Sequence, residues 1–141
     1  MKKTLDLYYI YLLYLGIIGE KKIMNLETQL NKDSAIDFAE GLNRLLSGIK
    51  KDYANWTNWK EGIDRFNNEL NVKSGRKYTK IMKGTSVWGF VANSDGMLKG
   101  IPYFKGDVFK AASWRAPAKH VRGSIFNIEQ NWFSWTGPNY L

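Results

Sequence analysis

The chain has 141 residues, a formal net charge of +8, 44% hydrophobic residues and no cysteine. This length suits one domain with a single hydrophobic core, and the apolar content is well above that of a disordered chain. The lack of cysteine excludes a disulfide scaffold, a thiolate zinc site and a cysteine nucleophile. His120 is the single histidine, which excludes a multi-histidine metal centre. The sequence therefore predicts no bound metal and no other cofactor.

The positive charge is concentrated in the C-terminal half. Residues 71–141 contain eleven Lys and Arg against three acidic residues, whereas residues 24–70 contain six against eight. Such an imbalance favours contact with polyanions, but it also raises solubility without any such partner. Charge alone leaves both explanations open.

The first 23 residues have three interpretations. The apolar run Thr4–Gly19 follows Lys2 and Lys3, as in a signal peptide. Against that, Asp6 interrupts the run, no small-residue cleavage site follows, and the run is shorter than the ~20 residues that span a bilayer. A second interpretation is a buried strand or helix of the fold, because short apolar runs are ambiguous.

In the third interpretation, which we favour, residues 1–23 are an over-extended start. Met24 opens an ordinary domain sequence, and Gly19–Ile23 can be encoded by a purine-rich stretch that resembles a bacterial ribosome-binding site. We therefore expect one α+β domain over residues 24–141. No contact with a membrane is expected unless residues 4–19 are translated and exposed.

A first helix is predicted to begin near Asp33. Ser34 followed by Asp37 resembles a capping box. Apolar residues then recur at steps of three and four and form one stripe, made of Phe38, Leu42, Leu45, Leu46, Ile49, Tyr53 and Trp56. This spacing predicts an amphipathic helix with one buried face.

A second, shorter helix is predicted to follow. Asn58 with Glu61 resembles another capping pair, and the apolar residues after it are Trp59, Ile63, Phe66 and Leu70. Together the two patterns predict a pair of packed helices over residues 33–70. A turn at Ser74–Gly75 is predicted to end this part of the chain.

From residue 76 the period changes to that of strands. Lys77–Met82 and Ser86–Ala92 alternate as strands do, with a short turn between them, and Asn93–Gly96 has turn chemistry. After a loop, Asp107–Ser113 is predicted to form a third strand.

The rest of the chain has weaker patterns. Pro117 is predicted to open a short helix over residues 116–122, which Gly123 ends. Ser124–Ile128 is predicted as a last strand, before an aromatic tail over residues 129–141. The predicted fold class is α+β, with an N-terminal helix pair packed on a small, mainly antiparallel sheet of three to four strands in a sheet-rich region over residues 76–128.

The densest cluster of polar, basic and aromatic residues lies between Gly106 and Phe126. Arg and Lys supply charge-assisted donors for phosphate, and Trp114 offers a stacking face for a base. The alternative is that the basic residues are solvated and Trp114 packs in the core, which we favour for this residue because aromatic burial dominates small domains.

The first predicted strand adds further positive charge, although a charged edge also blocks strand-to-strand aggregation. If the first and third strands share a sheet, Lys80 and Lys110 could extend one positive surface. The candidate nucleic-acid-binding residues are Arg76, Lys77, Lys80, Lys110, Trp114, Arg115, Lys119, His120 and Arg122.

No set of residues has the pattern of an active site. His120 could titrate near neutral pH, but no nucleophile and no orienting acid accompany it. Asp95, Asp107 and Glu129 are the acidic residues of the basic half, and no motif pairs two of them. Enzyme is therefore the least favoured class of function.

Three blocks carry a resemblance to a known group. These are GRKYTKIM from Gly75, SVWGFV from Ser86, and GDVFKAASWRAPAKHVRGSIF from Gly106 to Phe126. They resemble blocks in small proteins of tailed bacteriophages and viral metagenomes that have no assigned activity. The resemblance covers Gly75 to about Phe126, and the loop from Met97 to Lys105 departs from it. It implies a virus-encoded protein in the cytoplasm of a host cell and specifies no activity.

Two classes of function follow from these observations. The leading one is a nucleic-acid-binding module held by phosphate contacts, with little sequence specificity and steep salt dependence. The alternative is a protein-interaction or virion-associated, host-inhibiting factor whose partner is a host or virion protein. Its anchors would be the aromatic tail residues Trp132, Phe133, Trp135 and Tyr140. A tail folded back over the core is the simpler expectation for these four residues.

Overall fold

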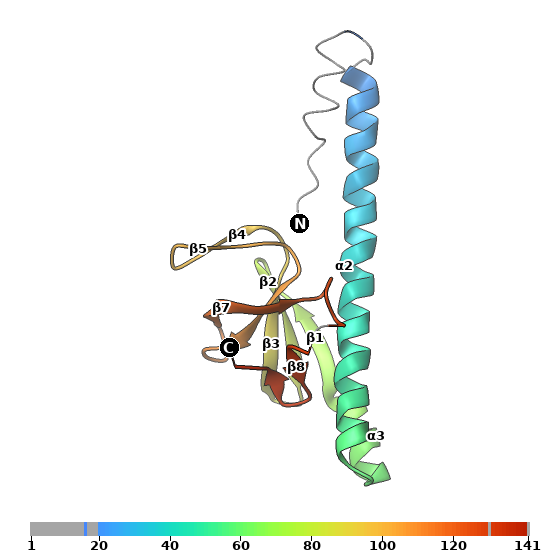
Figure 1. Ribbon diagram of the computed structural model, residues 1–141, viewed down its shortest axis with the longest axis vertical. Helices are drawn as coiled ribbons and strands as arrows, with labels where there is room; N and C mark the ends of the chain where they lie inside the picture. Colours follow the sequence, from blue (N-terminus) through green and yellow to red (C-terminus); the bar gives the residue numbers. More distant parts are fainter. Residues whose placement is uncertain (1–15, 17–19, 130, 141) are drawn as a thin grey trace.

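The computed structural model describes residue 16, residues 20–129 and residues 131–140, so the predictions for the apolar run at residues 4–19 fall, Gly16 apart, outside the described residues. In this part of the chain, two helices precede a series of short strands (Figure 1). They are α2 (Glu20–Trp56) and α3 (Lys60–Glu69). Neither described helix combines the length and the apolar character that crossing a membrane requires.

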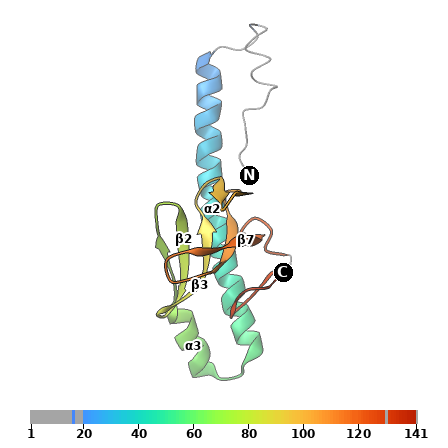
Figure 2. The same cartoon turned by 90° about the vertical axis from the view of Figure 1, so that its left-hand side faces the viewer.

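Helix α2 begins earlier than the sequence predicts. It starts at Glu20 and runs through Ser34, so the expected capping box at Ser34 is wrong. The residues before Ser34 include Glu, Lys, Met, Leu and Gln, which are good helix formers, and their combined preference outweighs one local capping signal. In both views the N-terminal half of α2 extends beyond the sheet (Figures 1 and 2).

Helix α3 runs back beside the end of α2 (Figure 2). Its N-cap is Trp59, which makes no side-chain capping bond, so the predicted cap at Asn58 is also wrong. The helix ends at Glu69 because Leu70 takes an extended backbone with φ −79° and ψ 116°. Leu70 begins strand β1 (Leu70–Ser74), which leads to the predicted turn.

The main sheet has five antiparallel strands in the order β1-β2-β3-β6-β7. Its other members are β2 (Tyr78–Lys83), β3 (Ser86–Ala92), β6 (Asp107–Ala111) and β7 (Pro117–Ser124). The two small hairpins are β4 (Gly96–Leu98) with β5 (Ile101–Tyr103), and β8 (Phe133–Ser134) with β9 (Gly137–Pro138). The α+β class and the helix pair are confirmed, while the sheet has five strands rather than three to four.

The helix predicted after Pro117 is wrong, because these residues form strand β7. Pro117 lies opposite Ala111 at the start of an edge strand, where a proline costs no ladder hydrogen bond. The strand predicted at Ser124–Ile128 is wrong as well, because most of that segment forms turns.

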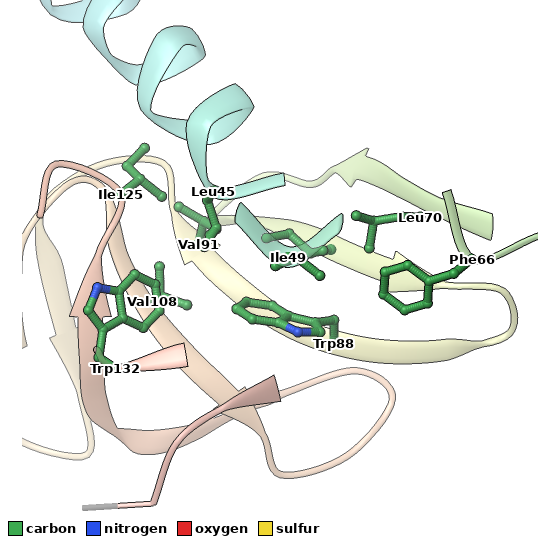
Figure 3. Packing of buried hydrophobic residues seen from close by; sticks show 10 residues of the cluster. Leu45, Ile49, Phe66, Leu70, Trp88, Val91, Val108, Ile125 and Trp132 are labelled. Carbon is green, nitrogen blue, oxygen red and sulfur yellow. The ribbon is translucent and has the colours of Figure 1, made fainter. Parts of the chain in front are cut away.

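One hydrophobic core lies between the helices and the sheet (Figure 3). Leu45 and Ile49 of α2 are completely buried, as the predicted stripe requires. They pack with residues of the sheet, of α3 and of the C-terminal region, namely Phe66, Leu70, Ile81, Trp88, Val91, Val108, Ile125 and Trp132. We call this side of the sheet the helix face.

The C-terminal hairpin closes this core. Trp132 is buried, and its indole N–H donates to the Asn127 carbonyl at 2.9 Å. A Cβ atom at Gly123 would overlap the Trp132 ring, so this close approach depends on glycine. The backbone N–H of Trp135 donates to Asp52 Oδ2 of α2 at 2.8 Å. The expectation of a tail folded back over the core is therefore confirmed for Trp132.

The opposite side of the sheet, which we call the outer face, carries a second, smaller core. Lys80 pairs with Phe90 and Phe90 pairs with Phe109, so these three residues lie across from one another on the same face. Tyr103 of β5 packs on Phe90 and Phe109 and is 6% exposed. The β4–β5 hairpin thus covers part of the outer face.

Tyr78 packs against this second core, and its ionisation makes the stability of the fold depend on pH under alkaline conditions. Burial, together with a hydrogen bond to Tyr103 and the charge of that neighbour, raises the pKa of Tyr78 from 10.0 to about 12. The unfolded chain loses this proton first, so the stability that Tyr78 contributes is complete below pH 10 and is lost as the pH rises towards about 12. Urea unfolding of the wild type and Tyr78→Phe should show the wild type losing its advantage across that window. A difference that stays constant there would contradict the assignment.

Candidate nucleic-acid interface

Trp114 lies at the tip of the turn between β6 and β7. The backbone N–H groups of Ala112 and Ser113 both donate to the Ala116 carbonyl, at 2.9 and 3.1 Å, and close this turn. Trp114 is 46% exposed, so the expected place in the core is wrong for this residue. Lys80 Nζ lies 4.3 Å from the centroid of the Trp114 ring and 5.7 Å from that of Phe90. A cation and an exposed indole therefore meet on the outer face.

Three further basic candidates lie after Trp114 along the chain. Arg115 follows it in the turn, while Lys119 and His120 belong to the edge strand β7, and all three are exposed. Within the described sheet β7 has no partner strand on its far side, so backbone N–H and C=O groups along this edge are also open to a binding partner. His120 directly precedes Val121, which packs against the second core, so strand alternation places His120 on the other face of β7. Lys80, Trp114, Arg115 and Lys119 form what we call the outer-face cluster.

Arg76 and Lys77 lie at the other end of the sheet. They are exposed in the turn before β2, and the Lys77 carbonyl accepts from the Asn93 N–H just after β3 ends. The antiparallel order places the turn after β6 at the opposite end. These two residues are thus separate from the outer-face cluster.

Lys110 and Arg122 lie on the helix face. Lys110 follows Phe109 in β6, so its side chain points away from the face that carries Lys80. Lys110 Nζ is 4.0 Å from the centroid of the Tyr140 ring, and Arg122 Nη1 donates to the Asn139 carbonyl at 3.3 Å. The strands do share a sheet, but the idea that Lys80 and Lys110 extend one surface is wrong.

The acidic residues of the basic half do not neutralise the cluster. Asp95 Oδ1 accepts from the Lys105 backbone N–H and Asp107 Oδ2 accepts from that of Phe104, at 2.9 and 2.8 Å. Burial raises the pKa of Asp107. Among the described residues, the one salt bridge joins Glu40 to Arg44 on α2. The cations of the outer-face cluster therefore face solvent, and none of them is paired with a carboxylate among the described residues.

The four aromatic residues predicted as protein-binding anchors lie in different environments. Trp132 is 8% exposed, and Phe133 packs over Gly48 of α2, where a Cβ atom would lie 2.8 Å from the ring. Trp135 is half-buried and Tyr140 is 84% exposed. Trp132 and Phe133 thus serve the fold, and the structure does not bring the four together as one free surface.

A family model described as a family of unknown function, DUF7717, matches residues 23–140. The chain belongs to this family. Comparisons with curated proteins and with solved structures return no significant match.

The DUF7717 match contains both the outer-face cluster and the C-terminal hairpin, together with α2 from Ile23 onwards. The family description assigns no activity.

Sequence reasoning missed a second exposed aromatic group in this DUF7717 domain. Trp56, the last residue of α2, and Trp59, the N-cap of α3, are 66% and 52% exposed. Both belong to the apolar stripes that the sequence predicts. Their position where one stripe ends and the next begins was the available signal, because a helix end often leaves its last apolar residue uncovered.

Proposed function

We propose that this protein binds nucleic acid through phosphate contacts, with little preference for sequence. The observation that carries the proposal is the exposed Trp114 ring with Lys80 against it and Arg115 beside it. Nucleic-acid-binding surfaces combine cations that follow the phosphates with aromatic rings on which bases stack. The absence of paired carboxylates among the described residues of the cluster supports the same function.

The resemblance to phage proteins adds a setting to this proposal. A small basic protein made by a virus in the host cytoplasm would meet DNA and RNA at high concentration. In that setting the protein would act as an accessory factor without catalytic activity.

A charge-reversal experiment tests the proposed function. The double variant Arg115→Glu/Lys119→Glu removes two phosphate contacts, so binding of labelled DNA and RNA should weaken at least about tenfold at low salt. The slope of log affinity against log salt should fall by about 1.8, since each lost contact contributes about 0.9. Fluorescence anisotropy of the full chain at several salt concentrations measures both quantities.

The matched control is Lys50→Glu/Lys51→Glu on α2, which changes the net charge equally on the side of the molecule away from the outer face. This control should keep most of the affinity. Equal losses for the two double variants would mean that net charge, rather than the outer-face cluster, holds the nucleic acid. Arg122 is unsuitable for this test because it supports the C-terminal hairpin.

A further inference from the structure

A hollow of about 350 Å³ lies where the two helices meet the C-terminal hairpin. Residues from four elements line it: Tyr53 and Trp56 from α2, Arg65 and Phe66 from α3, Lys83 from the end of β2, and Trp135 from the β8–β9 turn. We call it the aromatic pocket. It lies apart from the outer-face cluster, since Trp135 belongs to the hairpin that closes the helix-face core.

Three of the rings hold one another in place. Tyr53 and Phe66 are stacked, with centroids 4.2 Å apart and planes 2° from parallel. Trp135 meets the edge of Tyr53 at 5.0 Å, and its backbone N–H is fixed by Asp52. These contacts form before any ligand arrives, so the pocket wall is preorganised and loses little entropy on binding.

Trp56 completes the pocket with an uncovered ring. Its centroid is 4.9 Å from that of Trp135, yet 66% of the residue remains exposed. A large aromatic side chain exposed at the rim of a hollow, beside other rings, is typical of a binding surface. The exposed part of the Trp56 indole can stack a planar group.

The charges around the pocket indicate the chemistry of that group. Arg65 and Lys83 supply two cations, against one carboxylate, Glu69, and none of the three forms a salt bridge among the described residues. Lys83 Nζ already lies 4.9 Å from the Trp135 ring centroid, so a cationic ligand would be repelled. A ligand with both a planar ring and a negative charge therefore complements the aromatic rings and the two cations of the pocket.

We propose that the aromatic pocket holds one unpaired nucleobase of a single-stranded nucleic acid, stacked on Trp56, with its phosphate bound by Arg65 and Lys83. This inference rests on the proposed function and adds a preference for single strands. A base can enter the pocket only when it is free of its duplex partner. Glu69 can accept from an amino group of the base or from a ribose hydroxyl.

The test compares single-stranded and duplex binding of the full chain carrying Trp56→Ala. Fluorescence anisotropy with a labelled oligothymidylate should show roughly ten- to hundredfold weaker binding, the usual effect of losing one stacked base. Binding of a labelled duplex should stay within about twofold of the wild type. Trp56 is mostly exposed, so the variant should unfold at the wild-type temperature, which circular dichroism verifies.

Phe104→Ala is the matched control. Phe104 is also a mostly exposed aromatic residue, 54% exposed, and it does not line the pocket. Trp59 is unsuitable as a control because Arg65 Cζ lies 4.9 Å from its ring centroid. Removal of the Phe104 ring should change single-strand affinity by no more than about twofold, whereas Trp56→Ala gives the larger loss predicted from stacking. A loss as large as that of Trp56→Ala would overturn the assignment of the stacked base to the pocket.

The remaining outcomes separate the two proposals. If oligothymidylate binding is unchanged by Trp56→Ala but lost in Arg115→Glu/Lys119→Glu, the pocket assignment is wrong and the proposed function stands. If the wild type binds neither single strands nor duplexes, both proposals are wrong. A proline-rich peptide that binds the wild type and loses affinity with Trp56→Ala, while oligothymidylate does not, would make the pocket a peptide site and overturn the nucleobase assignment.

Discussion

Replacing Trp132 by alanine is expected to lower the free energy of unfolding by about 3–5 kcal/mol. The indole is 8% exposed, packs in the helix-face core, and donates to the Asn127 carbonyl at 2.9 Å. Its loss leaves both a cavity and an unpaired carbonyl. Urea denaturation followed by circular dichroism measures the change.

The partner variant Gly123→Ala tests the close approach of Trp132 itself. Because a Cβ atom at residue 123 would overlap the indole, this substitution should cost about 1–3 kcal/mol in the wild-type background. In the Trp132→Ala background the ring is gone, so the same substitution should cost little. Additive losses in the double variant would show that the two residues do not act on each other.

Truncation after residue 130 is expected to remove cooperative unfolding altogether. It deletes Trp132, Phe133 and Trp135, which cover the core, and also the Ser134 carbonyl that accepts from the Trp88 indole N–H at 3.0 Å. The shortened chain should retain helix but lose the near-ultraviolet dichroism of fixed aromatic rings, and should bind a hydrophobic dye. Such a truncation therefore cannot serve as a simple test of a tail-mediated protein interaction.

Truncation after Asn139 is the control for this experiment. It removes Tyr140, which is 84% exposed, and leaves both strands of the hairpin in place. Thermal unfolding should stay cooperative, with a small loss from the missing contact between Lys110 and the Tyr140 ring. Cooperative, wild-type-like melting of the chain that ends at residue 130 would contradict the role given to the hairpin.

Elements with a strong local pattern were predictable from the sequence. The alternation of Ser86–Ala92 between two turns matches β3, and the stripe that contains Leu45 and Ile49 marks the buried face of α2. Both patterns are set by burial of side chains close together in the chain.

Features decided by tertiary contacts were not predictable. The residues after Pro117 have the local signature of a helix start, but pairing with β6 makes them a strand. The sequence favours a buried Trp114 because it does not show that other aromatic residues fill both cores. The basic candidates were identified by charge, yet strand alternation separates Lys80 from Lys110, and the sheet's length separates Arg76 from Arg115.

The aromatic pocket was not predictable from the sequence either, because its residues meet only in the folded domain. Tyr53, Phe66, Lys83 and Trp135 come from four separate segments, and Trp135 reaches the other three only when the hairpin packs on α2. The exposure of Trp56 at the end of its stripe was the one local indication.

The hydrogen bond between Asp52 and Trp135 also limits when the domain can fold during synthesis. It joins residues 83 positions apart, and all five strands of the main sheet lie between them in the sequence. A nascent chain that has left the ribosome only as far as β7 exposes the apolar surface later covered by Trp132, Phe133 and Trp135. Until those residues emerge, the domain cannot complete its core, and the exposed apolar surface is a target for chaperones and proteases even though α2 is synthesised first.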